Sequence, residues 1–165
     1  SALPALEAVE HNLVPADVEA VVEATTLLSG LGFESGGLAA AHAVHEGLTA
    51  VEETQALAHG EKVNIGSLTQ LVLEGAPASE IEEFAVFTAR VGLPTTLTEA
   101  GLGEADDEVL DRVVEAASAP EETIHNLPFT PSHRDVRDAL KAVEGVGRSA
   151  RRRAGLADPE PPRKG

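Results

Sequence analysis

Apolar residues recur three and four positions apart along most of this chain, and strict alternation of apolar and polar residues is almost absent. The first spacing places side chains on one face of an α-helix, whereas alternation is what a half-buried strand requires. Proline, serine, threonine or aspartate stands ahead of most of these apolar runs, as is typical of helix N-termini. The pattern predicts an all-α fold, a compact helical bundle of about seven or eight helices.

Glycine and proline set the predicted helix boundaries. A first helix is expected from Pro15 to about Ser29, followed by a turn at Gly30–Phe33. Ser35 is expected to cap a second helix that begins in the next two glycines and stops at Gly47. Further helices are predicted at about residues 51–57, 59–74, 77–91, from Asp106 or Asp107 onward, and from Thr130 to about Arg152.

The length and composition favour one domain. A chain of 165 residues can bury a core, and its apolar residues are mostly Ala, Leu and Val, with four Phe and no Trp, Tyr or Met. Such small side chains suit closely packed helices. From Gly155 the composition changes to Asp, Pro, Glu, Arg and Lys, which cannot bury much surface. We therefore expect a helical domain over residues 1–154 and a disordered tail over 155–165.

Charge and cysteine content exclude several classes of function. The net charge of −16 disfavours a nucleic acid or an anionic membrane as partner. Without cysteine there is no disulfide and no thiolate metal ligand, so a metal would need histidines and carboxylates. No membrane span or secretory leader is visible, which predicts a cytoplasmic location. The acidic balance would suit a salt-rich cytoplasm, although GC-rich coding can produce a similar composition.

Three of the six histidines cluster in the sequence. His42 and His45 are one helical turn apart, and His59 stands where the next major helix is predicted to start. If these helices pack antiparallel, His42 and His59 can converge. Two neutral imidazoles, a carboxylate and an open position describe a catalytic zinc or ferrous iron better than a closed structural site. By spacing alone, such histidines are more often surface or core residues than ligands, so both interpretations stay open.

The glycines near these histidines also have two interpretations. Gly36, Gly37 and Gly60 stand at predicted helix starts, where glycine weakens the helix. They are explained if a ligand or another segment must approach the backbone, or simply if they cap the helices.

Two stretches of the sequence resemble a known family. Residues 23–49, EATTLLSGLGFESGGLAAAHAVHEGLT, followed by HGEKV at residues 59–63, are similar to glycerol dehydrogenases of the iron-containing alcohol dehydrogenase superfamily. The similarity continues more loosely through residues 68–74, VGLP at 91–94 and ETIHN at 122–126, and so covers roughly residues 5 to 145.

The resemblance implies a dehydroquinate synthase-like enzyme of two domains. Its N-terminal α/β domain binds NAD, its helical C-terminal domain binds a divalent metal, and a small polyol such as glycerol is oxidised to a ketone in the cleft between them. In this reading the chain is the metal-binding C-terminal part, incomplete at its N-terminal side. His42 and His59 match the two histidine ligands of Zn²⁺, with Fe²⁺ as an alternative metal. A third ligand, an aspartate, is expected at a position before Ser1.

The resemblance assigns other roles less specifically. His45 either supports a ligand from outside the metal's coordination sphere or is an alternative ligand; its plain alternative is a place on a solvated helix face. Phe33, Glu34 and Ser35 are candidates for the substrate pocket, and their plain alternative is a capping turn. No catalytic residue is assigned beyond the metal ligands. The residues that bind the cofactor are unknown, because no Gly-rich turn after a strand is found in the sequence.

Three hypotheses about function follow. The chain is a part of a glycerol dehydrogenase that is inactive without its NAD-binding domain or subunit, or a non-catalytic metal-binding or interaction module derived from that domain, or a structural bundle whose histidines are relics. A helical domain without its partner segments would expose apolar surface, so we expect a homo-oligomer or a bound partner.

Overall fold

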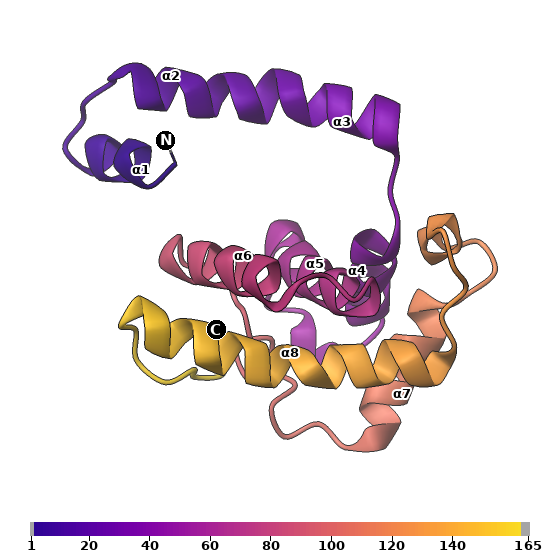
Figure 1. The fold of residues 1–165 in the computed structure, drawn as a ribbon. Coiled ribbons are helices and arrows are strands. Elements are labelled where there is room, and N and C mark those ends of the chain that lie inside the picture. The colour runs from indigo at the N-terminus through magenta and orange to yellow at the C-terminus, as the bar shows by residue number, and fades with distance from the viewer. Residues whose placement is uncertain (1, 163–165) are drawn as a thin grey trace. The chain divides into compact units, whose positions relative to one another are not determined.

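The computed structural model describes residues 2–162, which form helices α1 to α8 and short helical turns, with no strand among them (Figure 1). The predicted all-α class is confirmed. Contacts divide the chain into two compact units, Ser1–Gly37 and Leu38–Gly165. None of the described helices combines the length and the hydropathy that crossing a bilayer would require.

The first unit is a short helix followed by a long one. Its elements are α1 (Ala2–Glu10), α2 (Ala16–Glu23), the π-helical segment η1 (Ala24–Leu28) and α3 (Ser29–Gly36). The last three follow one another without a break, so the predicted turn at Gly30–Phe33 is wrong. A helical glycine costs only about 1 kcal/mol relative to alanine, which does not end a helix by itself. The helix ends where the backbone becomes left-handed, at Gly37 with φ 71°.

The second unit contains the aliphatic core. Its elements are α4 (Ala40–Thr49), the 3-10 turn η2 (Glu52–Thr54), α5 (His59–Leu73), α6 (Ala78–Arg90), α7 (Asp107–Ala117), the 3-10 turn η3 (Thr123–Asn126) and α8 (His133–Ala154). Helix α4 packs against α5 and α7, while α8 packs against α5 and α6 (Figure 1). The fully buried side chains are mostly leucine, isoleucine and valine, whereas Phe87 and Phe129 are exposed.

Helix α4 differs from its predicted boundaries at both ends. It begins at Ala40 instead of Gly36, and Gly47 lies inside it instead of ending it. A Cβ atom built on Gly47 would come within 2.3 Å of the Val113 carbonyl oxygen on α7. Gly47 therefore permits a close helix contact, and the prediction that it ends the helix is wrong.

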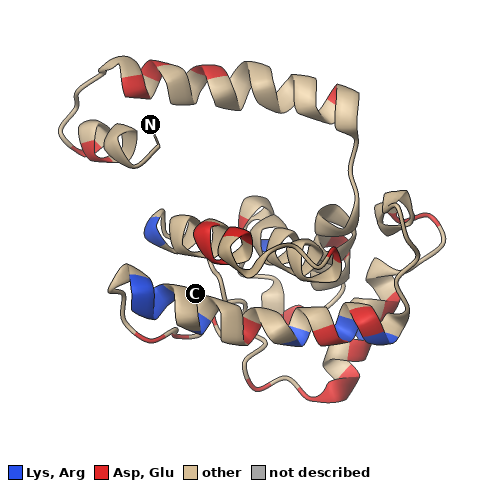
Figure 2. Ribbon diagram, viewed as in Figure 1, with Lys and Arg blue, Asp and Glu red and all other residues tan. Residues whose placement is uncertain are grey.

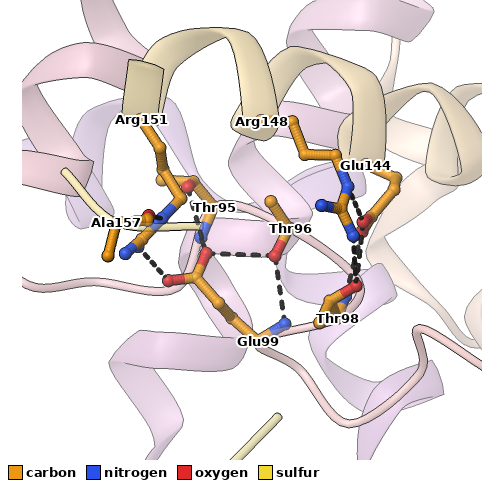
Figure 3. Close-up of polar contacts among 8 residues, drawn as sticks. All are labelled: Thr95, Thr96, Thr98, Glu99, Glu144, Arg148, Arg151 and Ala157. Atoms are coloured by element: carbon orange, nitrogen blue, oxygen red, sulfur yellow. Dashed lines mark hydrogen bonds and ion pairs between the residues drawn. The ribbon is translucent and has the colours of Figure 1, made fainter. Parts of the chain in front are cut away.

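Two carboxylates attach the loop before α7 to helix α8 (Figure 3). Glu99 accepts hydrogen bonds from the Thr95 backbone N–H at 2.9 Å and from the Thr96 hydroxyl at 3.1 Å, and it pairs with Arg151. Glu144 on α8 accepts from the backbone N–H of Thr98 at 2.9 Å. The loop thus satisfies its polar groups on α8, although it contains little regular structure.

The segment after α8 contacts other residues of the second unit. Gly155 ends the helix in a left-handed conformation, and Arg151 donates a hydrogen bond to the Ala157 carbonyl at 2.9 Å. Pro159 is buried, and Pro162 lies near Gly101. Composition predicted disorder over 155–165; of these residues, 163–165 lie outside the described part of the chain.

Candidate metal site

Helices α4 and α5 carry the three clustered histidines. Their backbones approach closely because residue 66 is glycine: a Cβ atom there would lie 2.1 Å from the Ala41 carbonyl oxygen. The Ala41 backbone N–H, near the start of α4, donates to Gln70 Oε1 at 2.9 Å. Ala41 contacts the later part of α5 while His45 contacts its first residue, His59, as in helices that run in opposite directions.

The three imidazoles lie close to one another. The ring centroids of His42 and His59 are 5.8 Å apart, and those of His45 and His59 are 4.4 Å apart. His59 Nδ1 lies 3.0 Å from His45 Nε2, within hydrogen-bond distance. His42 and His45 are partly buried, whereas His59 is exposed. The site is therefore open to solvent on the side of His59 in the described part of the chain.

The surroundings of His42 and His45 favour neutral rings. Burial, and then the neighbouring His59, lower the pKa of His42, and the Glu46 carboxylate only partly opposes this. Burial also lowers the pKa of His45, against the opposing effect of Glu46. A neutral imidazole has a nitrogen lone pair, which is the form that coordinates a metal.

Side chains from η3 hold the backbone that leads into α4. Thr123 Oγ1 donates to the Ala39 carbonyl at 2.8 Å, and Asn126 Nδ2 donates to the Leu38 carbonyl at 2.8 Å. Sequence reasoning missed both roles. The only signal for these roles was that both residues lie in the ETIHN stretch, which shares the family resemblance. Nothing in its spacing predicts contacts with residues 84 and 88 positions earlier in the chain.

Lys62 and Glu61, adjacent in the first turn of α5, have different environments. Lys62 is 7% exposed, and its ammonium group donates to Thr49 Oγ1 at 3.2 Å. Glu61 accepts a hydrogen bond from the Ala58 backbone N–H at 2.6 Å and so caps α5. Lys62 thus adds a buried positive charge near His45, and this charge also lowers the pKa of that ring.

The donors present fit part of a metal site. Imidazoles that share a zinc ion at about 2.1 Å and near-tetrahedral angles have centroids roughly 5 to 6 Å apart, which matches His42 and His59. Within residues 2–162, no group of three or more His, Cys, Asp or Glu side chains is arranged to hold a metal ion. The described chain therefore offers two imidazole nitrogen donors, from His42 and His59, and leaves further coordination positions to other ligands.

The three residues expected to line a substrate pocket belong to the first unit. Phe33, Glu34 and Ser35 lie in the last turns of α3 and are exposed. Ser35 is part of that helix and does not cap α4. Their placement beside the histidines stays a prediction.

Comparisons with known proteins agree on one kind of relative. No family model matches the chain. It is 56% identical to a glycolaldehyde reductase of Halobacterium salinarum over 90% of its own length, and 54% identical to a glycerol dehydrogenase of Thermotoga maritima over 87%. It spans 41% and 40% of these two proteins. The crystal structure of a glycerol dehydrogenase from Schizosaccharomyces pombe superposes on 97% of this chain and 41% of that one, with a TM-score of 0.88 and 41% identity.

Proposed function

Because this chain is homologous to the C-terminal, helical part of glycerol dehydrogenases, we propose that it carries the metal-binding half of an NAD-dependent polyol dehydrogenase. The observation that supports this most directly is the approach of His42 to His59, from two different helices, at a separation suited to one shared cation. The metal in the proposal is Zn²⁺, with Fe²⁺ as the alternative.

In this proposal two histidines from different helices bind the cation. His42, from the first turn of α4, and His59, from the start of α5, supply two neutral nitrogen ligands. Because both are neutral, they leave the positive charge of the cation undiminished. Once bound, a divalent cation supplies Lewis acidity, which makes an alcohol substrate easier to deprotonate before hydride transfer. Gly66 and Gln70 act indirectly, because they keep α4 and α5 close enough for the two rings to meet.

The substrate class and the cofactor are parts of the same proposal. The names of the two relatives, glycerol dehydrogenase and glycolaldehyde reductase, support a small polyol or hydroxyaldehyde as substrate. No strand occurs among residues 2–162, so we assign NAD binding to the segment of the relatives that this chain does not match. That segment, as a domain or a separate subunit, is the partner that we propose, in a cytoplasmic homo-oligomer.

Calorimetric titration with zinc tests the metal site directly. We expect the 165-residue chain to bind about one zinc ion, and both His42→Ala and His59→Ala to lose most of that affinity. His133→Ala is the matched control, since it removes an exposed histidine at the start of α8. Equal zinc affinity in all four proteins would contradict the proposal.

Activity requires the nucleotide-binding part as well. We expect no sustained NADH production from the chain alone with NAD, zinc and glycerol. A chimera of the unmatched part of the Halobacterium relative with this chain should oxidise a small polyol or reduce glycolaldehyde. Its His42→Ala variant should be inactive while His133→Ala stays active. A chimera that folds and binds zinc but has no activity would favour a second candidate function, a non-catalytic metal-binding module. The described chain fits this candidate too, because it offers two histidine donors without a third ligand.

A further inference from the structure

The imidazole of His45 lies between two other polar groups. On one side, its Nε2 is 3.0 Å from Nδ1 of His59. On the other, its Nδ1 is 3.2 Å from a carboxylate oxygen of Glu46. That contact is close enough for an ion pair but is poorly aligned for a hydrogen bond, and Nδ1 is buried with no other partner. Glu46 is therefore the acceptor available to this nitrogen.

The chemistry of Glu46, His45 and His59 indicates which ring nitrogen of each histidine carries the proton. A carboxylate is negative and only accepts, so it favours the neutral His45 tautomer that carries its proton on Nδ1, the nitrogen that faces Glu46. His45 Nε2 then carries a lone pair and accepts, and the proton between the two rings must come from His59 Nδ1. A neutral His59 ring with its proton on Nδ1 has its lone pair on Nε2.

On the premise of the proposed function, we infer that His45 is a positioning residue: with Glu46, it holds the His59 ring in the tautomer that presents Nε2 to the cation. Ligand imidazoles in metalloproteins are oriented in this way by a hydrogen bond from the second ring nitrogen. His59 has more need of such support than His42, because it is exposed in the first turn of α5, where packing alone does not restrict its ring.

A competing assignment makes His45 itself a ligand. Nitrogen atoms 3.0 Å apart can also share one cation, so distance alone does not separate the two roles. Glutamine does separate them. Its side-chain carbonyl can accept the hydrogen bond from His59, but it is a poor ligand for zinc.

Nitrogen NMR of the histidine rings tests the inference without metal. In the metal-free chain above neutral pH, we expect His59 to be protonated mainly on Nδ1. His45→Ala should shift it toward the Nε2-protonated form that predominates in free histidine, and His45→Gln should restore the Nδ1-protonated form. A His59 ring protonated mainly on Nε2 in the parent chain would overturn the inference, whether or not zinc binds.

Zinc titration of the same variants supplies a second measurement. We expect His45→Ala to weaken zinc binding roughly 10- to 100-fold, which is the usual effect of losing an outer-shell partner. His45→Gln should recover most of the affinity, and Glu46→Ala should weaken it by a smaller factor. Glu83→Ala is the matched control for Glu46, since both are exposed helical glutamates. Circular dichroism confirms that each variant is folded.

The outcomes distinguish this inference from the proposed function. If the parent chain binds zinc and His45→Ala binds it equally well, the positioning role is wrong while the metal site stands. If His45→Gln binds as weakly as His45→Ala, His45 is a ligand and the positioning role is again wrong. If no variant binds zinc, the proposed function fails, and the ring tautomers alone decide whether His45 orders the His59 proton.

Discussion

Gly66 on α5 lies directly against the backbone of Ala41 on α4, so that a methyl group added at residue 66 would come within 2.1 Å of the Ala41 carbonyl oxygen. Ala41 is the residue directly before His42, and Gly66 lies four residues after Lys62, which donates a hydrogen bond to Thr49. The distance between the two helices that carry the histidines therefore depends on the absence of one side chain.

Gly66→Ala should destabilise the chain and separate α4 from α5. We expect the free energy of unfolding to fall by about 2 to 3 kcal/mol, because the methyl group meets backbone that cannot rotate away. Zinc affinity should fall as well. Gly145→Ala on α8 is the control, because nothing lies within 4 Å of its added Cβ, and it should stabilise by about 0.5 to 1 kcal/mol. Urea denaturation measures both; equal stability of the two variants would show that the helices can move apart freely.

Arg151→Ala should release the loop that Glu99 attaches to α8. Both side chains of this pair are about 15% exposed, so the substitution leaves a mostly buried carboxylate without its cation. We expect a loss of about 2 to 3 kcal/mol, between the costs for surface and for fully buried pairs. Arg134→Ala, which removes an exposed i,i+4 partner of Asp138, should change stability by less than about 0.5 kcal/mol. A double-mutant cycle with Glu99→Gln isolates the pair, and a coupling near zero would contradict its role.

Acid should weaken the metal-free chain through His42. Burial lowers the pKa of this ring below its ordinary value of 6.5. As pH falls through 6.5, the unfolded chain takes up a proton that the folded chain does not yet bind, so the free energy of unfolding decreases until the lower folded pKa is passed. Urea denaturation between about pH 5 and 8 should show this slope, and it should be smaller in His42→Gln than in the parent or in His133→Gln. An unchanged slope in His42→Gln would assign the effect to other groups.

Salt should stabilise the chain by screening its negative charge. The sequence carries a net charge of −16, and in Figure 2 the Lys and Arg residues that the structure describes lie mostly on α8, while Asp and Glu recur on nearly every helix. Raising KCl from about 0.05 to 1 M shortens the Debye length from more than 10 Å to about 3 Å, which reduces this repulsion. We expect the midpoint of urea denaturation to rise across this range. A constant or falling midpoint would show that favourable ion pairs such as Lys141–Asp107 outweigh the repulsion.

Local sequence determined the helical class and singled out the three histidines. The spacing of apolar residues predicts helices because side chains three and four apart share a helix face whatever the rest of the chain does. His42 and His45 share a face for the same reason. The resemblance added the family and the ligand roles of His42 and His59. It did not indicate that the Glu46 carboxylate faces Nδ1 of His45, because that contact depends on side-chain orientation.

Tertiary structure decided what each glycine does. The sequence predicted a turn at Gly30 and a helix stop at Gly47, and it assigned Gly66 no special role. In the structure Gly30 lies inside a continuous helix, while Gly47 and Gly66 allow α7 and α5 to contact α4. The missing Cβ has the same local cost in each case, and only the neighbour that would collide with it distinguishes them. Such neighbours lie tens of residues away, so the closeness of α4 and α5, and with it the meeting of His42 and His59, is a property of packing.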